Sequence, residues 1–133
     1  MIIGIGTDIC DIRRIEKSIE KFGQKFLDKT FTPDEQAYCE AKARPAMSYA
    51  KRFAAKEAVA KALATDTSGA LGWTDVSVKN VPSGRPIVLI KGTAQVRLDA
   101  ITPTDHKATI HISLSDDYPY ATAFAVVETL SDC

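Results

Sequence analysis

The chain has 133 residues, a length that suits one domain with a sizeable core. Its 17 basic and 17 acidic residues cancel, and no long block of one sign predicts a nucleic-acid tail or a polybasic membrane patch. No stretch approaches the roughly 18 apolar residues of a membrane span. We therefore expect a single domain over residues 1–133, located in the cytoplasm, with neither a nucleic acid nor a membrane as partner.

Cysteine usage points to the same compartment. The three cysteines, Cys10, Cys39 and Cys133, are odd in number and lack metal-ligand spacing. We expect reduced thiols rather than a disulfide framework.

Residues 2–9 alternate as a strand would, with isoleucines mainly on one side and Gly4, Gly6 and Asp8 on the other. The stretch "GIGTD" lacks the spacing of a P-loop or of a dinucleotide-binding loop. The glycines are therefore predicted to be positions of close approach, and their small face leaves space beside Asp8.

Three helices are predicted next. Apolar residues recur at helical spacing over 12–22, with Asp11 as the N-cap and a glycine after the last turn. "TPDE" at 32–35 is a capping box that opens a second helix, which Pro45 ends. The third and central helix begins near Ser48 and runs to about Ala64.

Strands dominate the rest of the chain. Residues 74–80 and 85–92 predict a hairpin, 93–101 a short amphipathic helix, and 107–115 and 120–128 two further strands. Helices cluster early and strands late. We therefore predict an α+β fold in which a small, mostly antiparallel sheet packs on the long central helix.

The central helix carries charges where an apolar face is expected. Arg52 and Lys56 share an arc with apolar residues, and Glu57 and Lys61 lie side by side at its edge. A buried carboxylate requires a cation. Glu57 and Lys61 could simply form an ordinary surface pair at i, i+4 spacing.

A second interpretation of Glu57 is that it forms a site together with Asp8. Two carboxylates from separate elements could hold Mg²⁺, which would keep its remaining positions for water and phosphate, and such a site suits a diphosphate substrate. Alternatively, Asp8 caps the following turn or pairs with Arg13. The sequence alone leaves both interpretations open.

The strand "ATIHISLSD" has a polar face. Thr109, His111, Ser113 and Ser115 alternate with apolar residues, so an imidazole and three hydroxyls point to one side. This face could line a pocket, or it could be the solvated side of an antiparallel sheet.

Several of these stretches together resemble the holo-acyl-carrier-protein synthases, the small group of 4′-phosphopantetheinyl transferases. The resemblance implies Mg²⁺-dependent transfer of the phosphopantetheine arm of coenzyme A to a serine of acyl carrier protein, in fatty acid biosynthesis. Adenosine 3′,5′-bisphosphate would be released. The matching stretches are "GIGTDICDIRRIE" at 4–16, "FTPDE" at 31–35, "RFAAKEAVAKAL" at 52–63, "NVPSGRP" at 80–86 and "HISLS" at 111–115.

The resemblance also implies roles for single residues. Asp8 and Glu57 would be the metal ligands and, with Lys61, the catalytic residues. The resemblance further implies a homotrimer with active sites at subunit interfaces. Part of the coenzyme A site would then come from a neighbouring subunit. The resemblance places Arg52, Lys61 and His111 near the phosphates of coenzyme A. Lys42 and Arg44 lie in the segment expected to reach the nucleotide from the neighbouring subunit.

The first helix presents a basic face that suits an acidic carrier protein. Arg14 is the strongest candidate contact, followed by Lys21 and Lys25, although a solvated helix face would look similar. One position departs from the family pattern, because Asp116 stands where many relatives have histidine. Any role of that histidine is not transferred to this chain.

Two other functions fit part of the pattern. Water in place of the serine would give a hydrolase of coenzyme A, although hydrolysis needs no surface for docking a protein. A carrier-binding module without catalysis would use the basic helix and leave the two carboxylates without a function.

Overall fold

The computed structural model describes residues 1–66 and 69–132 of the chain. Helices dominate the first half and strands the second half, as the sequence predicts. In chain order the elements are β1 (Ile2–Asp11), α1 (Ile12–Phe22), α2 (Gln24–Thr30), α3 (Pro33–Glu40), α4 (Pro45–Ala62), the 3-10 helix η1 (Trp73–Asp75), β2 (Val76–Asn80), β3 (Pro86–Ile90), α5 (Gly92–Ile101), β4 (His106–Asp117) and β5 (Tyr120–Ser131).

Three strands form the main sheet, and both neighbouring pairs in it are antiparallel. β5 lies in the centre between β1 and β4, with Asp8 of β1 opposite Ala123 and His111 of β4 opposite Val126. β2 and β3 pair as a separate antiparallel hairpin. The predicted α+β class with a small antiparallel sheet is confirmed, but the hairpin forms a sheet of its own.

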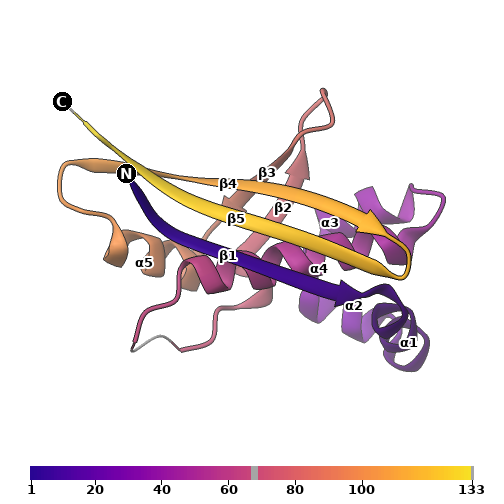
Figure 1. The fold of residues 1–133 in the computed structure, drawn as a ribbon. Helices are drawn as coiled ribbons and strands as arrows, with labels where there is room; N and C mark the ends of the chain where they lie inside the picture. Colours follow the sequence, from indigo (N-terminus) through magenta and orange to yellow (C-terminus); the bar gives the residue numbers. More distant parts are fainter. Residues whose placement is uncertain (67–68, 133) are drawn as a thin grey trace.

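The helix α4 lies across one face of the main sheet (Figure 1). It has 18 residues and is the longest of the helices in the described ranges. Small side chains meet at this contact, because Ala54 and Ala58 of α4 and Ala121 and Ala125 of β5 are fully buried. Alanine facing alanine brings the helix close to the strands.

Two glycines of β1 allow the closest approach. A Cβ atom added at Gly4 would lie 2.1 Å from the carbonyl oxygen of Ala62, and one added at Gly6 would lie 2.0 Å from that of Ala58. The predicted role of these glycines is therefore confirmed. The backbone of α4 fills the face of the two glycines, and the predicted space beside Asp8 is present, because Asp8 lines a cavity.

Most predicted helix caps are present. The Asp11 carboxylate accepts a hydrogen bond from the Arg13 N–H at 3.0 Å, and α1 ends at Gly23, whose φ is 58°. Such a positive φ favours glycine. Thr32 and Glu35 form the predicted capping box at the start of α3.

Two helix predictions are wrong. Pro45 was expected to end the preceding helix, but α3 already ends at Glu40, and Pro45 instead begins α4. Proline suits that position because the first turn of a helix leaves its N–H groups unpaired. The seven residues of α2 were not predicted as a helix, since so short a segment shows too little periodicity.

The charges predicted on the packed side of α4 are indeed buried. Lys56 and Arg52 are each 2% exposed. The Lys56 Nζ donates hydrogen bonds to Glu35 Oε1 at 2.7 Å and to the carbonyl oxygens of Trp73 and Val76. All three donors of this ammonium are therefore used, and α3, α4 and the start of β2 are joined at one point.

The other face of the main sheet is open and apolar. Ile5 and Ile9 of β1 are 62% and 66% exposed, and Phe124 of β5 is 47% exposed. Figure 1 shows all the labelled helices on the opposite side of the sheet. Three large apolar side chains on one solvated face form an exposed apolar patch, which is typical of a surface that binds a partner.

The two described cysteines fit the prediction of reduced thiols. Cys10 and Cys39 are free and buried, and burial is the main cause that raises their pKa values to about 11 and about 12. Cys133 lies outside the described residues. Within the described ranges, every helix is too short or too polar to cross a lipid bilayer.

Replacement of Gly6 by alanine tests the contact between β1 and α4. The new methyl group would collide with the backbone of Ala58, so we expect a loss of about 3 kcal/mol in unfolding free energy. Gly69→Ala is the matched control, because a Cβ atom there meets nothing within 4 Å. Urea unfolding at one fixed protein concentration measures both variants, and equal stability of the two would contradict the close contact.

Replacement of Lys56 by methionine tests the buried ion pair. It leaves the Glu35 carboxylate charged and buried without its cation, which we expect to cost about 3 to 5 kcal/mol of unfolding free energy. Lys61→Met removes an exposed lysine from the same helix and should change stability by less than about 0.5 kcal/mol. The prediction fails if the two variants unfold at the same urea concentration.

Candidate functional site

The two predicted carboxylates share one cavity. Asp8 of β1 and Glu57 of α4 line a hollow of about 310 Å³. Arg14 of α1 lines it as well, and Phe26 and Phe53 are among its apolar walls. Two acids, far apart in the chain, therefore face the same volume beside a basic side chain from the first helix.

Lys61 pairs with Asp8 rather than with its helical neighbour Glu57. Its Nζ lies 3.3 Å from Asp8 Oδ1 and 2.9 Å from the Thr7 carbonyl oxygen. The alternative partner of Asp8, Arg13, forms its ion pair with Asp11 at 2.7 Å. Lys61 is 55% exposed, and it has a third donor that can reach a ligand.

Glu57 lies in an environment that disfavours its charge. Burial raises the pKa of this carboxyl, the neighbouring charge of Asp8 raises it further, and Lys61 acts in the opposite direction. Two carboxylates that repel one another are stabilised when a cation joins them. The pair Asp8 and Glu57 is thus electrostatically prepared for a positive ligand.

The donor set fits Mg²⁺ better than a metal held by protein alone. Among residues 1–66 and 69–132, no group of three or more His, Cys, Asp or Glu residues could hold a metal ion. Mg²⁺ commonly uses one or two carboxylates and fills its other positions with water and substrate phosphates. Asp8 and Glu57 fit that pattern.

The buried side chain of Arg52 is bound by residues of the same chain. Its guanidinium lies 3.9 Å from the ring centre of Tyr38 and donates to Asn80 Oδ1, while its Nε is buried without a partner. These three residues line a second cavity of about 370 Å³. Arg52 therefore reaches a ligand only at the wall of that cavity.

The segment between α3 and α4 carries two more predicted basic residues. Lys42 lies 4.4 Å from the ring centre of Tyr38, and Arg44 lies 4.8 Å from that of Tyr118. Lys42 and Arg44 are both exposed. They are thus oriented by aromatic rings while their charges face solvent.

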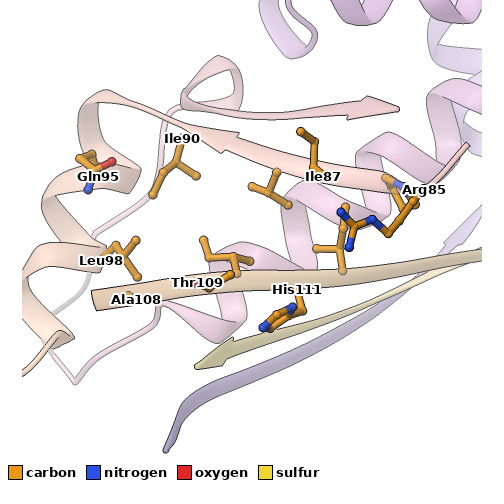
Figure 2. A pocket seen from close by; sticks show the side chains of 12 residues that line it. Arg85, Ile87, Ile90, Gln95, Leu98, Ala108, Thr109 and His111 are labelled. Atoms are coloured by element: carbon orange, nitrogen blue, oxygen red, sulfur yellow. The ribbon is translucent and has the colours of Figure 1, made fainter. Parts of the chain in front are cut away.

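His111 lies elsewhere, on the open face of the sheet. It lines a cavity of about 580 Å³ between β3, α5 and β4, and Figure 2 shows Arg85 above the same region. Arg85 was not among the predicted site residues. Its place in "NVPSGRP" was visible in the sequence, but only the packing of β3 beside β4 brings it to the cavity that His111 lines.

The predicted metal ligands and the cavity of His111 do not form one site within a single chain. The cavity with Asp8 and Glu57 shares no lining residue with the cavity that holds His111 and Arg85. The structure brings together Asp8, Glu57, Lys61 and Arg14, and it leaves the predicted nucleotide contacts elsewhere.

The predicted basic face of α1 is exposed. Arg13 is neutralised by Asp11, and Arg14 turns toward the acidic cavity. Lys21 and Lys25 project from the end of α1 and from α2, and both are exposed. Arg14 therefore lies beside the carboxylates, and Lys21 and Lys25 add exposed positive charge on α1 and α2.

The sequence model of the 4′-phosphopantetheinyl transferase superfamily matches residues 4–123. The chain belongs to this family. A holo-[acyl-carrier-protein] synthase from Methylobacterium sp. (strain 4-46) is 53% identical over 132 residues, which are 99% of this chain and 98% of the relative. That from Rhizobium rhizogenes is 51% identical over 130 residues, covering 98% and 97%. The resemblance read from the sequence is confirmed, and the chain is an enzyme of this transferase family.

Solved structures agree with this assignment. The holo-[acyl-carrier-protein] synthase of Neisseria meningitidis matches with a TM-score of 0.81 and 34% identity, covering 96% of this chain and 99% of that one. The Helicobacter pylori enzyme in complex with coenzyme A matches with a TM-score of 0.76 and 31% identity, covering 93% and 99%.

In this member of the transferase family, the unusual Asp116 has a partner. Its Oδ2 lies 3.0 Å from the Nζ of Lys51 on α4. A carboxylate at this position thus ties the end of β4 to the central helix.

Proposed function

We propose that this protein transfers the 4′-phosphopantetheine arm of coenzyme A to a serine of apo acyl carrier protein and releases adenosine 3′,5′-bisphosphate. The observation that carries the proposal is the cavity that Asp8, Glu57 and Arg14 line together. Relatives about 50% identical over the full chain are named holo-[acyl-carrier-protein] synthases, and a similar structure holds coenzyme A. We place the reaction in fatty acid biosynthesis and the protein, as one domain over residues 1–133, in the cytoplasm.

Asp8 and Glu57 would hold Mg²⁺ beside the diphosphate of coenzyme A. The ion supplies positive charge that stabilises the phosphate oxygens during phosphoryl transfer. The two carboxylates come from rigid elements, a strand and a helix in close contact, so their positions are fixed before the substrate binds. Such preorganisation is the main contribution of a protein to this type of reaction.

Lys61 would contact the diphosphate from the same side. Its exposed ammonium already bonds to Asp8 and Thr7, which fixes its position and leaves one donor for a phosphate oxygen. This cation would stabilise the charge that develops on the leaving phosphate. The ammonium would also orient the incoming serine, whereas only the neutral amine would accept the serine proton.

The remaining contacts of coenzyme A would come from a neighbouring subunit. His111, Arg44 and Lys42 are exposed basic residues that lie outside the acidic cavity, and Arg52 lines another cavity. A substrate bound only by one chain would miss them. We therefore propose that the active site is completed at an interface between subunits.

The open face of the main sheet suits that interface. Ile5, Ile9 and Phe124 expose large apolar area there, next to His111 of β4. Burial of this face between copies of the chain would stabilise an assembly. We propose a homotrimer, which sedimentation equilibrium at assay concentrations measures directly; a monomer that is fully active would contradict it.

The carrier protein would dock on α1 and α2. Acyl carrier protein is strongly acidic, and Arg14, Lys21 and Lys25 form a local basic surface on a chain whose net charge is zero. Arg14 also lines the acidic cavity, so a carrier docked here would bring its serine next to the two carboxylates.

The variants Asp8→Asn and Glu57→Gln test the catalytic proposal. Each removes one charged ligand, so we expect transfer to fall by about 100-fold or more while the circular dichroism spectrum is unchanged. Asp99→Asn, which lies on α5 outside the cavities described above, is the control. Mass spectrometry of the carrier measures transfer, and a chelator should abolish it until Mg²⁺ is restored.

The same assay separates the competing functions. A hydrolase would release adenosine bisphosphate from coenzyme A without any carrier protein and without a gain in carrier mass. Full activity of both carboxylate variants would overturn the proposed site.

The double variant Lys21→Glu with Lys25→Glu tests carrier docking. Two reversed charges should weaken carrier binding by about tenfold at low salt, with a smaller loss at high salt because exposed charges are screened. Coenzyme A affinity should stay unchanged, since neither lysine lines the cavities described above. Lys107→Glu on β4 is the charge control. Titration calorimetry at two salt concentrations measures the effect, and equal losses at both would contradict the docking surface.

A further inference from the structure

His111 has a partner on the neighbouring strand that the proposed mechanism does not use. Its Nε2 lies 3.2 Å from Oε1 of Glu128. His111 of β4 faces Val126 of β5, and Glu128 is opposite Thr109, so the two side chains are diagonal neighbours across one strand pair. Both lie on the open face of the sheet.

The pair contributes little to the stability of the fold. The His111 side chain is 56% exposed and that of Glu128 is 40% exposed. Ion pairs with such exposure stabilise a fold little because water screens them, and the long hydrogen-bonded ladder of β4 and β5 holds the strands together without this pair. What the contact fixes is the orientation of the imidazole ring.

We propose that Glu128 is a positioning residue that orients His111 toward the 3′-phosphate of coenzyme A. This inference rests on the proposed function, in which His111 contacts a phosphate of that substrate. The phosphate can be identified by elimination. The proposed function assigns the diphosphate to Asp8, Glu57 and Lys61 at the acidic cavity. The phosphate left for His111 is then the one on the ribose.

The hydrogen bond to Glu128 selects which ring nitrogen meets the ligand. With Nε2 donating to the carboxylate, only Nδ1 remains for a phosphate oxygen. An imidazole placed between two anions must carry a hydrogen on each nitrogen, so His111 would bind the phosphate as a cation. A carboxylate that fixes one nitrogen of a histidine and thereby aims the other is a common device in metal sites, and the same geometry serves an anion here.

Arg85 supplies the second positive charge at this end of the cavity. It lines the same hollow as His111, and Figure 2 shows the two labelled side chains from β4 and from the start of β3. A basic side chain whose orientation is fixed by a hydrogen bond defines the position of a phosphate better than one without such a bond. Glu128 would thus contribute to the preference for coenzyme A over dephospho-coenzyme A, which lacks the 3′-phosphate.

Steady-state kinetics of Glu128→Ala with both substrates tests the proposal. We expect KM for coenzyme A to rise about threefold to tenfold with little change in kcat, because one orienting hydrogen bond is lost. KM for dephospho-coenzyme A should stay the same. Glu128→Gln keeps an acceptor oxygen and should recover most of the loss. Glu20→Ala, which removes an exposed negative charge on α1 outside this cavity, is the control.

The double variant with His111→Ala shows whether Glu128 acts through the histidine. His111→Ala alone should raise KM for coenzyme A, and adding Glu128→Ala should then have no further effect. A lower KM in Glu128→Ala, an equal rise for both substrates, or additive effects in the double variant would overturn the proposal. If His111→Ala alters binding but Glu128→Ala does not, only the role of Glu128 fails. If His111→Ala leaves coenzyme A binding unchanged, the proposed contact of His111 fails as well.

Discussion

The contact between β1 and α4 is the constraint on which the rest of the structure depends. Because Gly4 and Gly6 have no side chains, the carbonyl oxygens of Ala62 and Ala58 lie where Cβ atoms would otherwise be. At that distance, the next inward residue of the strand, Asp8, reaches the edge of the helix at Glu57 and Lys61. The glycines thus bind no phosphate themselves, but they set the separation of the two carboxylates.

Burial of charge in α4 serves two separate purposes. Lys56 is fully buried and bonded to Glu35 and to two carbonyl groups, so it fixes the helix against α3 and the start of β2. Glu57, the next residue, is turned away from that pair by one helical step and faces the acidic cavity. These adjacent residues of opposite charge therefore have different roles. Lys56 anchors the helix, and Glu57 is available to a ligand.

A small chain reaches a large substrate by dividing the site between subunits, as proposed above. The acidic cavity of about 310 Å³ holds the groups suited to phosphoryl transfer, and a separate cavity of about 580 Å³ holds His111 and Arg85. Burial of the exposed apolar face of the main sheet would drive the assembly. Under this proposal, the open face of the sheet is the surface that becomes buried between subunits.

The sequence by itself determined the class of the fold and the members of the candidate site. Alternation in β1, the capping box at Thr32 and the helix formers of α4 are local signals, because each depends on residues only a few positions apart. The motifs that carry Asp8, Glu57 and Lys61 also identified the family. These features could be read without any knowledge of distant contacts.

Only the tertiary structure decided the partners. The spacing of Glu57 and Lys61 suggested a pair within the helix, whereas Lys61 of α4 bonds to Asp8 of β1. Glu35 was predicted as a capping residue, but it also neutralises Lys56, and Arg85 and Glu128 meet His111 only through the packing and register of the strands. Periodicity states which side of an element a residue faces. It does not state which element lies opposite, because that depends on contacts between residues far apart in the chain.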